Sequence, residues 1–300
     1  MGRAMIASPS PAPRPLGKSG LSVSPIAWGM WRFHGDDIGA AQALIEAAFA
    51  AGITLFDTAD IYGVGTDGFG AAEALLGRVF ATAPGLRARM ILATKGGIVP
   101  GTPYDSSPDY LTRALDASLA RLNVEQVDLW QIHRPDLLAH PQETARTLED
   151  MITSGKVRAI GVSNFTPAQV SALASFLTVP LASTQPEFSP LHLDPLWDGT
   201  LDQAMALGLA VLAWSPLGGG RLGDGHGAVA TLLASQGERF GVSAAAATYS
   251  WLLAHPARPI PIVGSQRPER IAEAAHAFRV SWTRAEWYAV LQASMGEPLP

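Results

Sequence analysis

Two neighbouring stretches decide the fold: Ser107-Pro-Asp-Tyr-Leu-Thr-Arg-Ala-Leu-Asp-Ala-Ser-Leu-Ala-Arg-Leu122 and, four residues later, Val127-Asp-Leu-Trp-Gln-Ile132. The first stretch has the pattern of a helix. Ser107 can cap its start, proline stands at the first helical position, and leucines at 111, 115, 119 and 122 share one face. The second stretch is a mostly apolar run of strand length. Together they predict a helix that leads into a buried strand.

The same alternation recurs along the chain. Further helix starts are predicted at Thr166-Pro167, at Arg267-Pro268-Glu269 and at Thr283, where a capping box with Glu286 opens the last helix. The apolar runs of strand length are Ser24–Trp28, Ile53–Phe56, Met90–Ala93, Val127–Ile132, Val157–Val162, Val179–Ser183, Ala210–Ala213 and Ile260–Val263.

Eight strand-then-helix units in about 250 residues are typical of a parallel (β/α)8 TIM barrel. The alternative is a doubly wound open sheet, which needs fewer strands and a phosphate loop directly after the first one. We therefore predict a single α/β barrel domain over residues 14–300, ending in a helix. Residues 1–13 are Pro-rich, and we expect them to form a disordered or extended tail.

Composition excludes several classes of protein. The chain of 300 residues contains no Cys, so disulfides, thiolate metal sites and a Cys nucleophile are ruled out. Its net charge of −5 argues against nucleic-acid or membrane-surface partners. The chain shows no apolar run of about 20 residues and no signal peptide, so we expect a cytoplasmic protein.

Lysine is rare in this chain. Lys18, Lys95 and Lys156 are the only lysines among 21 basic residues. Lys18 and Lys156 fall in predicted turns, whereas Lys95 follows a predicted strand. A lysine differs from an arginine in its compact charge and its readily shifted pKa. Lys95 is therefore a candidate for chemistry.

Polar side chains follow nearly every predicted strand. In a TIM barrel the carboxyl ends of the strands meet at the mouth, where the chemistry takes place. We therefore expect one site that contains Asp57, Tyr62, Lys95, His133, Ser163, Asn164, Gln185, Trp214, Ser215, Gly264 and Ser265.

Two mechanisms use such a lysine. In a Schiff-base aldolase the uncharged amine attacks a carbonyl. Alternatively, an ammonium group lowers the pKa of a neighbouring tyrosine that donates a proton. The spacing of Asp57 and Tyr62 favours the second mechanism, because Asp57 can pair with Lys95 on the adjacent strand and hold it charged. A charged lysine is a poor nucleophile.

Six segments together resemble the aldo-keto reductase family. The first, Gly52-Ile-Thr-Leu-Phe-Asp-Thr-Ala-Asp-Ile-Tyr-Gly63, is similar to a signature of the family. Pro15–Ser24 fits a hairpin that closes the base of the barrel, and the resemblance extends over about residues 14–295. The other five segments are Ala93–Gly96, Asp128–His133, Gly155–Phe165, Ala213–Gly218 and Ile262–Ser265.

The resemblance implies reduction of an aldehyde or ketone to an alcohol with NADPH. Tyr62 would be the general acid and Lys95 the neighbour that lowers its pKa. Asp57 would pair with Lys95, and His133 would orient the carbonyl oxygen. Trp28 and Trp31 would line the substrate side.

The resemblance also implies which residues bind the cofactor. Many members carry a lysine where this chain has Gly264, so NADH stays possible although NADPH is favoured. The expected contacts are Ser163, Asn164 and Gln185 with the carboxamide, Trp214 with the nicotinamide ring, Ser215 and Leu217 nearby, Gly264, Ser265 and Arg270 with the phosphates, and Glu273 near the adenine.

Competing motifs are weaker. The sequence Gly63-Val-Gly-Thr-Asp-Gly68 matches the G-x-G-x-x-G motif of dinucleotide-binding proteins, but it does not directly follow a predicted strand, as that motif requires. The seven His are scattered without metal-binding spacing, so we expect no metal. Two rival functions stay open: a cofactor-binding, redox-sensing subunit with little turnover, and the aldolase that uses Lys95. Neither the natural carbonyl substrate nor the oligomeric state follows from the sequence.

Overall fold

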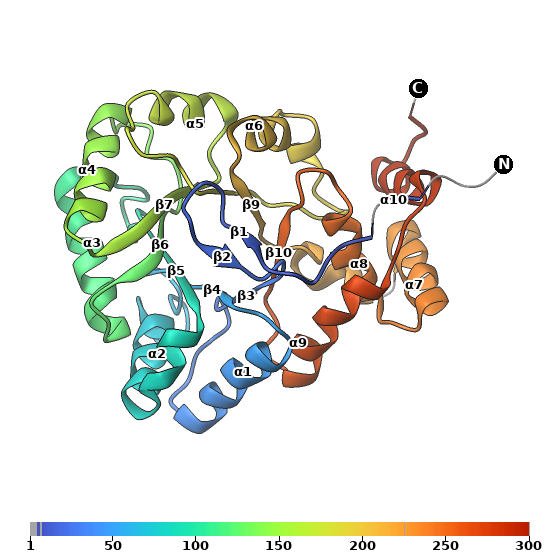
Figure 1. The fold of residues 1–300 in the computed structure, drawn as a ribbon, viewed down its shortest axis with the longest axis horizontal. Helices are drawn as coiled ribbons and strands as arrows, with labels where there is room; N and C mark the ends of the chain where they lie inside the picture. The colour runs from blue at the N-terminus through green and yellow to red at the C-terminus, as the bar shows by residue number, and fades with distance from the viewer. Residues whose placement is uncertain (1–4, 7, 225, 300) are drawn as a thin grey trace.

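A computed structural model describes residues 5–6, 8–224 and 226–299. Eight parallel strands close into a barrel in the order β10-β3-β4-β5-β6-β7-β8-β9 (Figure 1). This confirms the predicted fold. The strands are β3 (Ala27–Gly29), β4 (Leu55–Asp57), β5 (Ile91–Gly96), β6 (Val127–Ile132), β7 (Val157–Ser163), β8 (Ser183–Gln185), β9 (Ala210–Ala213) and β10 (Ile260–Val263).

Helices surround the strands, with short 3-10 turns between some of them (Figure 1). The predicted caps are confirmed: Ser107 accepts a hydrogen bond from Tyr110 N, and Thr166 and Thr283 each form a capping box. The helices are α1 (Ile38–Ala50), α2 (Ala71–Thr82), α3 (Pro108–Leu122), α4 (Pro141–Thr153), α5 (Pro167–Ala174), α6 (Thr200–Leu207), α7 (Ala228–Phe240), α8 (Ala244–Leu253), α9 (Pro268–Ala274) and α10 (Arg284–Met295).

A hairpin closes one end of the barrel, as expected. Strands β1 (Arg14–Pro15) and β2 (Ser22–Val23) pair antiparallel and lie across the barrel in Figure 1. The buried side chains of Leu16, Leu21 and Val23 pack on residues that point into the barrel, such as Leu55. Gly17, with φ +57°, is required at this turn, because a Cβ there would lie 2.2 Å from Ala182 O.

Several predicted strand bounds are wrong, and two strands start at least three residues late. The first strand starts at Ala27 rather than Ser24, because the Ser24 hydroxyl is bonded locally to Ile26 O. The run Val179–Ser183 overlaps the observed strand β8 only at Ser183. Pro180 has no N–H to donate to a neighbouring strand. The hydrogen bonds therefore begin with Ala182 N, which donates to Ile160 O over 2.7 Å.

The ends of the described chain are attached to the barrel. Met5 forms an antiparallel bridge with Thr283, and Ile6 N donates to Trp282 O over 2.8 Å. Residues 1–4 and 7 of the expected tail lie outside the described residues. The boundary at residue 14 stays a prediction.

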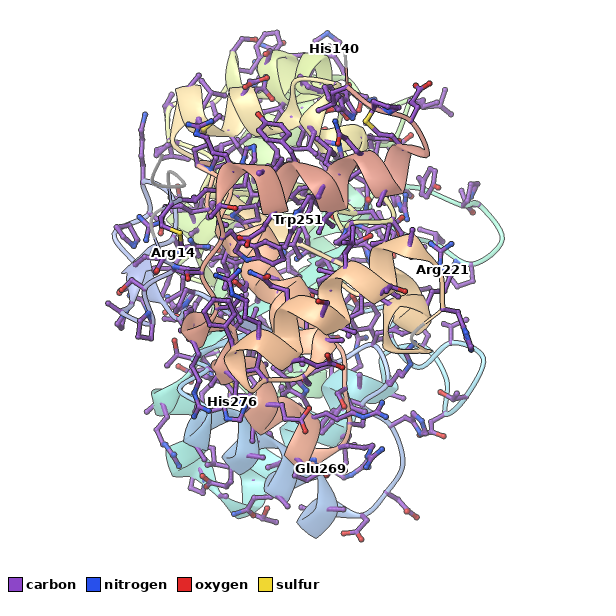
Figure 2. The ribbon with its side chains drawn as sticks, turned by 90° about the vertical axis from the view of Figure 1, so that its right-hand side faces the viewer. Arg14, His140, Arg221, Trp251, Glu269 and His276 are labelled. Atoms are coloured by element: carbon purple, nitrogen blue, oxygen red, sulfur yellow. The ribbon has the colours of Figure 1, made fainter. Side chains whose placement is uncertain are left out.

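The C-terminal helix is fixed by two tryptophans. Trp251 of α8, labelled in Figure 2, stacks on Trp287 of α10 with ring centroids 4.6 Å apart and planes 6° apart. Each indole N–H donates to the other residue's backbone oxygen, over 3.1 and 3.0 Å. Among the described residues we find no helix that combines the length and apolar character needed to cross a bilayer.

Candidate active site

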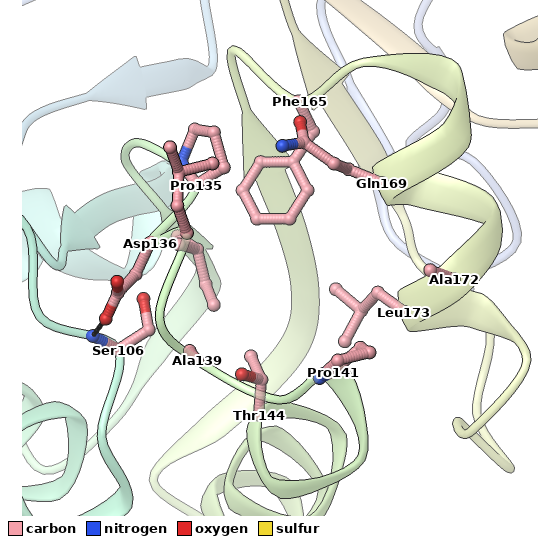
Figure 3. Close-up of a pocket in the computed structure, with 12 residues that line it drawn as sticks. Ser106, Pro135, Asp136, Ala139, Pro141, Thr144, Phe165, Gln169, Ala172 and Leu173 are labelled. Atoms are coloured by element: carbon pink, nitrogen blue, oxygen red, sulfur yellow. Dashed lines mark hydrogen bonds between the residues drawn. The ribbon is translucent and has the colours of Figure 1, made fainter.

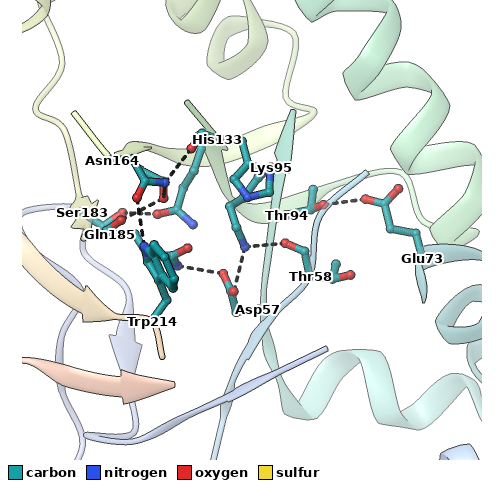
Figure 4. Close-up of polar contacts among 12 residues, drawn as sticks. Asp57, Thr58, Glu73, Thr94, Lys95, His133, Asn164, Ser183, Gln185 and Trp214 are labelled. Atoms are coloured by element: carbon teal, nitrogen blue, oxygen red, sulfur yellow. Dashed lines mark hydrogen bonds and ion pairs between the residues drawn. The ribbon is translucent and has the colours of Figure 1, made fainter. Parts of the chain in front are cut away.

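A buried ion pair lies at the carboxyl ends of β4 and β5. Lys95 Nζ is 2.7 Å from Asp57 Oδ2, and their side chains are only 1% and 3% exposed. The ammonium also donates to Thr58 O over 2.8 Å (Figure 4). The pair was predicted from the adjacent strands, and the structure confirms it.

Hydrogen bonds from two further strands hold Asp57 in place. Gln185 Nε2, at the end of β8, donates to Asp57 Oδ1 over 3.0 Å. Ser163 Oγ, at the end of β7, donates to Gln185 O over 2.8 Å. Both carboxylate oxygens of Asp57 are therefore satisfied, so the lysine has a fixed counter-ion.

Tyr62 lies directly beside this pair. The ammonium of Lys95 is 5.0 Å from the centroid of the phenol ring. Burial raises the pKa of Tyr62, the positive charge of Lys95 opposes that rise, and Asp57 and Asp60 add to it. As expected, the charge of Lys95 acts to lower the pKa of Tyr62. The net shift of this pKa is nevertheless upward, because desolvation of the phenol by burial dominates. Tyr62 is thus protonated at neutral pH.

The neighbouring groups have opposite charge states. Burial acts to lower the pKa of Lys95, but Asp57 and Tyr62 outweigh it, so the net shift is upward and the ammonium stays charged. Burial, Lys95 and Arg134 hold the pKa of His133 well below its usual value. The rings of His133 and Tyr62 have centroids 5.9 Å apart. A protonated phenol, an ammonium and a neutral imidazole therefore meet at one point.

Only one of the two expected substrate-side tryptophans is accessible. Trp31 is 56% exposed, and its ring contacts Tyr62 edge-on at a centroid distance of 5.1 Å. Trp28 is fully buried between Phe33 and Phe56, and its indole N–H donates to Ser265 O. Core packing thus leaves Trp28 no exposed surface with which to contact a substrate, so of the two tryptophans Trp31 is the accessible one.

The residues expected around the carboxamide contact one another. Asn164 Nδ2 donates to His133 O and to Ser163 Oγ, over 3.0 and 2.9 Å. Trp214 Nε1 donates to Asn164 Oδ1 over 3.0 Å (Figure 4). Asn164 and Ser215 both have positive φ, of 61° and 49°, which is uncommon outside glycine and concentrates at functional sites.

The segment after β10 is more open. Arg267 pairs with Glu269, whereas Arg270 forms no ion pair within the described part of the chain. Both side-chain amide atoms of Gln266 are enclosed and lack a hydrogen-bond partner among the described residues. A Cβ on Gly264 would have only Arg32 Nη1 within 4 Å, at 3.5 Å. An unsatisfied amide, open space and guanidinium groups fit the phosphates of a dinucleotide.

Glu273 and Leu217 are the remaining residues that were expected to bind the cofactor. Glu273 lies in α9, one turn from Arg270, and is half-buried. Leu217 follows β9 and packs partly buried against the core.

A cavity of about 210 Å³ lies beside the mouth, between α4 and α5 (Figure 3). Its walls include Asp136, Phe165 and Leu173. None of the expected catalytic or cofactor-binding residues lines it, so it is separate from the site described above.

The fingerprint-like glycines form a loop. Gly63, Gly65 and Gly68 all have positive φ, and α2 starts only at Ala71, so this is no strand-turn-helix phosphate site. The described residues hold no group of three or more His, Asp or Glu suited to a metal ion.

Two buried acids behind the site were not predicted. Asp60 and Glu73 are both fully buried. Glu73 shares the buried face of α2 with Leu76 and Phe80, three and seven residues later. The sequence did contain a signal for a buried Glu73, because this charged residue stands at the helical spacing of an apolar face. For Asp60 the only signal was its place between Asp57 and Tyr62.

Comparisons with known proteins agree with this geometry. A family model described as "Aldo/keto reductase family" matches residues 25–294. A 6-dehydroglucose reductase of Novosphingobium aromaticivorans is 60% identical, over 97% of this chain and 98% of its own. A protein of the same name from Agrobacterium fabrum is 40% identical, over 92% and 96%.

A solved structure supports the fold. It is a thermostable aldo-keto reductase in complex with the inhibitor epalrestat, 24% identical, with a TM-score of 0.81 over 94% of this chain and 99% of the other. The barrel, the site and the matching model lead to one conclusion: this chain belongs to the aldo-keto reductase family.

Proposed function

We propose that this protein reduces a sugar aldehyde to an alcohol, with NADPH as hydride donor and Tyr62 as proton donor. The observation that carries the proposal is the buried Asp57–Lys95 ion pair directly beside a protonated Tyr62. The family accounts for carbonyl reduction in general.

When bound, the cofactor supplies a hydride to the carbonyl carbon. Tyr62 then donates its hydroxyl proton to the carbonyl oxygen, and the alcohol forms. The ammonium of Lys95, fixed by Asp57, stabilises the phenolate left on Tyr62. Neutral His133 donates a hydrogen bond that orients the same oxygen. Ser163, Asn164 and Gln185 would hold the carboxamide group of the nicotinamide ring.

The names of the relatives support the proposed substrate class. Two of them are named 6-dehydroglucose reductase, and that name denotes glucose oxidised to an aldehyde at C6. The exposed ring of Trp31 beside Tyr62 offers an apolar face to the C–H groups of a sugar. Arg270, which lacks an ion pair among the described residues, supports NADPH over NADH through the additional phosphate.

The experiment measures NADPH oxidation in the near ultraviolet with 6-dehydroglucose, and with 4-nitrobenzaldehyde as a second aldehyde. Tyr62→Phe should lower turnover about 1000-fold, because it removes the proton donor. Tyr288→Phe, on an exposed tyrosine of α10, is the matched control and should retain wild-type turnover.

NADPH binding, followed by fluorescence, should survive Tyr62→Phe, because the phosphate contacts lie after β10. Near-full turnover of Tyr62→Phe would refute the assigned proton donor. Tight NADPH binding without turnover of any aldehyde would instead favour the redox-sensing subunit. Trapping of Lys95 by a carbonyl compound and borohydride would favour the aldolase.

A further inference from the structure

Asp60 lies in the catalytic loop between Asp57 and Tyr62. Its backbone N–H donates to Lys95 O over 3.0 Å, so the loop is fixed to the strand that carries the catalytic lysine. Its side chain is fully buried, although no role in the proposed reaction requires a carboxyl group there. The charge state of this group therefore needs an explanation.

In the described part of the chain no side chain donates a hydrogen bond to the carboxyl group of Asp60, and the neighbouring Ile61 N–H only partly offsets its burial. Neither Oδ1 nor Oδ2 has a partner among the described residues. Glu73, equally buried, provides a contrast: it accepts from Thr94 Oγ1 over 2.5 Å and from Arg121 Nε over 2.8 Å, and it forms an ion pair with Arg121 Nη2 at 2.7 Å. An ionised carboxylate in the interior needs such donors. Glu73 has side-chain donors, whereas Asp60 has only the adjacent Ile61 N–H.

The surroundings of Asp60 are apolar on one side and negatively charged on another. A Cβ on Gly96 would lie 3.3 Å from Asp60 Oδ2 and 2.7 Å from the Trp130 ring, so the carboxyl lies close to that ring. The negative charge of the Glu73 carboxylate also disfavours ionisation of the Asp60 carboxyl. A low dielectric and a like charge both disfavour a second anion at this position.

We propose that Asp60 is a neutral carboxylic acid at neutral pH and a positioning residue for the Lys95–Tyr62 pair. In its neutral form it leaves Asp57 as the one carboxylate that balances Lys95. Once ionised, it adds a negative charge that faces Lys95 and makes Tyr62 a weaker acid. The role of Tyr62 rests on the proposed function, whereas the protonation of Asp60 does not.

The electrostatic surroundings agree with this assignment. Burial raises the pKa of Asp60 to about 8, Glu73 of α2 adds to the rise, and Arg121 of α3, the Ile61 N–H and Lys95 of β5 oppose it. Tyr62 in the same loop and Tyr110 of α3 also face Asp60: burial raises the pKa of each, and the charge of an ionised Asp60 adds to the rise.

Infrared spectroscopy tests the protonation directly. A protonated carboxylic acid has a carbonyl stretch that a carboxylate lacks. We expect this band in the wild type at pH 6.5 and its loss with a midpoint near pH 8. It should shift when the aspartates carry ¹³C in the side-chain carboxyl, and not when the glutamates do, a comparison that needs no variant.

Variants then locate the group. Asp60→Asn should lack the band, whereas Asp116→Asn, on an exposed aspartate of α3, should retain it. A wild type without the band, a band that does not respond to the aspartate label, or one that persists in Asp60→Asn would each overturn the protonation of Asp60.

Two measurements test the positioning role. In ultraviolet titrations of the cofactor-free protein, with Tyr62→Phe as reference, Tyr62 should ionise at least about 0.5 pH unit lower in Asp60→Asn than in wild type. The rate of aldehyde reduction should fall above pH 8 in wild type and in Asp116→Asn, but not in Asp60→Asn.

Identical titrations of Tyr62 in wild type and Asp60→Asn would overturn the positioning role. A protein that reduces no aldehyde would refute the proposed function, while the infrared and ultraviolet results would still decide the state of Asp60.

Discussion

The two ends of the candidate site are built differently. At the carboxyl ends of β4 and β5, Asp57 and Lys95 are buried and held by Gln185 and the Thr58 carbonyl. After β10, Arg267 and Arg270 lie exposed on the surface, and the Gln266 amide has no partner among the described residues. The buried end is organised by the protein itself, whereas the other end has polar groups that a ligand can satisfy.

This difference separates two kinds of effect. A change at the buried end disturbs a network whose members depend on one another, so its cost should be large and should appear in turnover. A change at the exposed end removes one solvated contact, so its cost should be modest and should appear in cofactor affinity.

Among the changes that compare the two ends of the site, Lys95→Arg should have the largest effect. Arginine keeps the charge, but its planar guanidinium cannot replace a compact ammonium between Asp57, Thr58 O and Tyr62. We expect a folded protein whose turnover is lower by about 100-fold or more. Steady-state kinetics measure the loss, and circular dichroism checks the fold. Wild-type turnover would show that any cation suffices at this position.

The buried network was largely predictable from the sequence, because it follows from strand ends. A parallel barrel brings the residues after each strand to one face, so Asp57, Lys95 and Gln185 could be placed together from an alternation of apolar runs. The Asp57–Lys95 pair needed only adjacent strands. The strand predicted least accurately, Val179–Ser183, starts only at Ser183, and the proline at 180 has no N–H to donate.

What the sequence left out depends on packing in three dimensions. Trp28 and Trp31 are three residues apart, yet one is buried and the other is 56% exposed. The net pKa shift of Tyr62 is set by burial, which a spacing of residues does not measure. Asp60 and Glu73 are separated by twelve residues, and only the fold shows that their charges interact.

Asp60→Asn should give the next largest effect, on stability. The folded-state pKa of Asp60 is about 8, against an ordinary 3.8, so the folded protein binds an extra proton between these values. The free energy of unfolding of the wild type therefore falls as pH rises from about 4 to 8. Asp60→Asn removes this cost and should be more stable than wild type by about 2 kcal/mol at pH 8.5.

Thermal unfolding at pH 5 and pH 8.5 measures this effect. The advantage of Asp60→Asn should be small at the lower pH and larger at the higher one. An advantage that is independent of pH, or a less stable variant at pH 8.5, would contradict an unpartnered carboxyl at this position.

Arg270→Ala tests the exposed end. We expect the Kd for NADPH to rise about tenfold, which corresponds to about 1.4 kcal/mol, while NADH binding changes little. Arg267→Ala is the matched control, because Arg267 already pairs with Glu269 and should contribute less. Fluorescence titration with both cofactors measures the effect. An equal loss of NADPH and NADH affinity in Arg270→Ala would show that it does not recognise the additional phosphate.

Lys156→Ala should have the smallest effect and completes the comparison among lysines. Lys156 pairs with Asp116 at 2.6 Å, as Lys95 pairs with Asp57 at 2.7 Å, but its side chain is 41% exposed. Water screens such a pair, so its loss should change the free energy of unfolding by less than about 0.5 kcal/mol and leave turnover unchanged. Urea unfolding and steady-state kinetics measure both. A large loss of turnover in Lys156→Ala would mean that burial is not what distinguishes Lys95 from the other lysines.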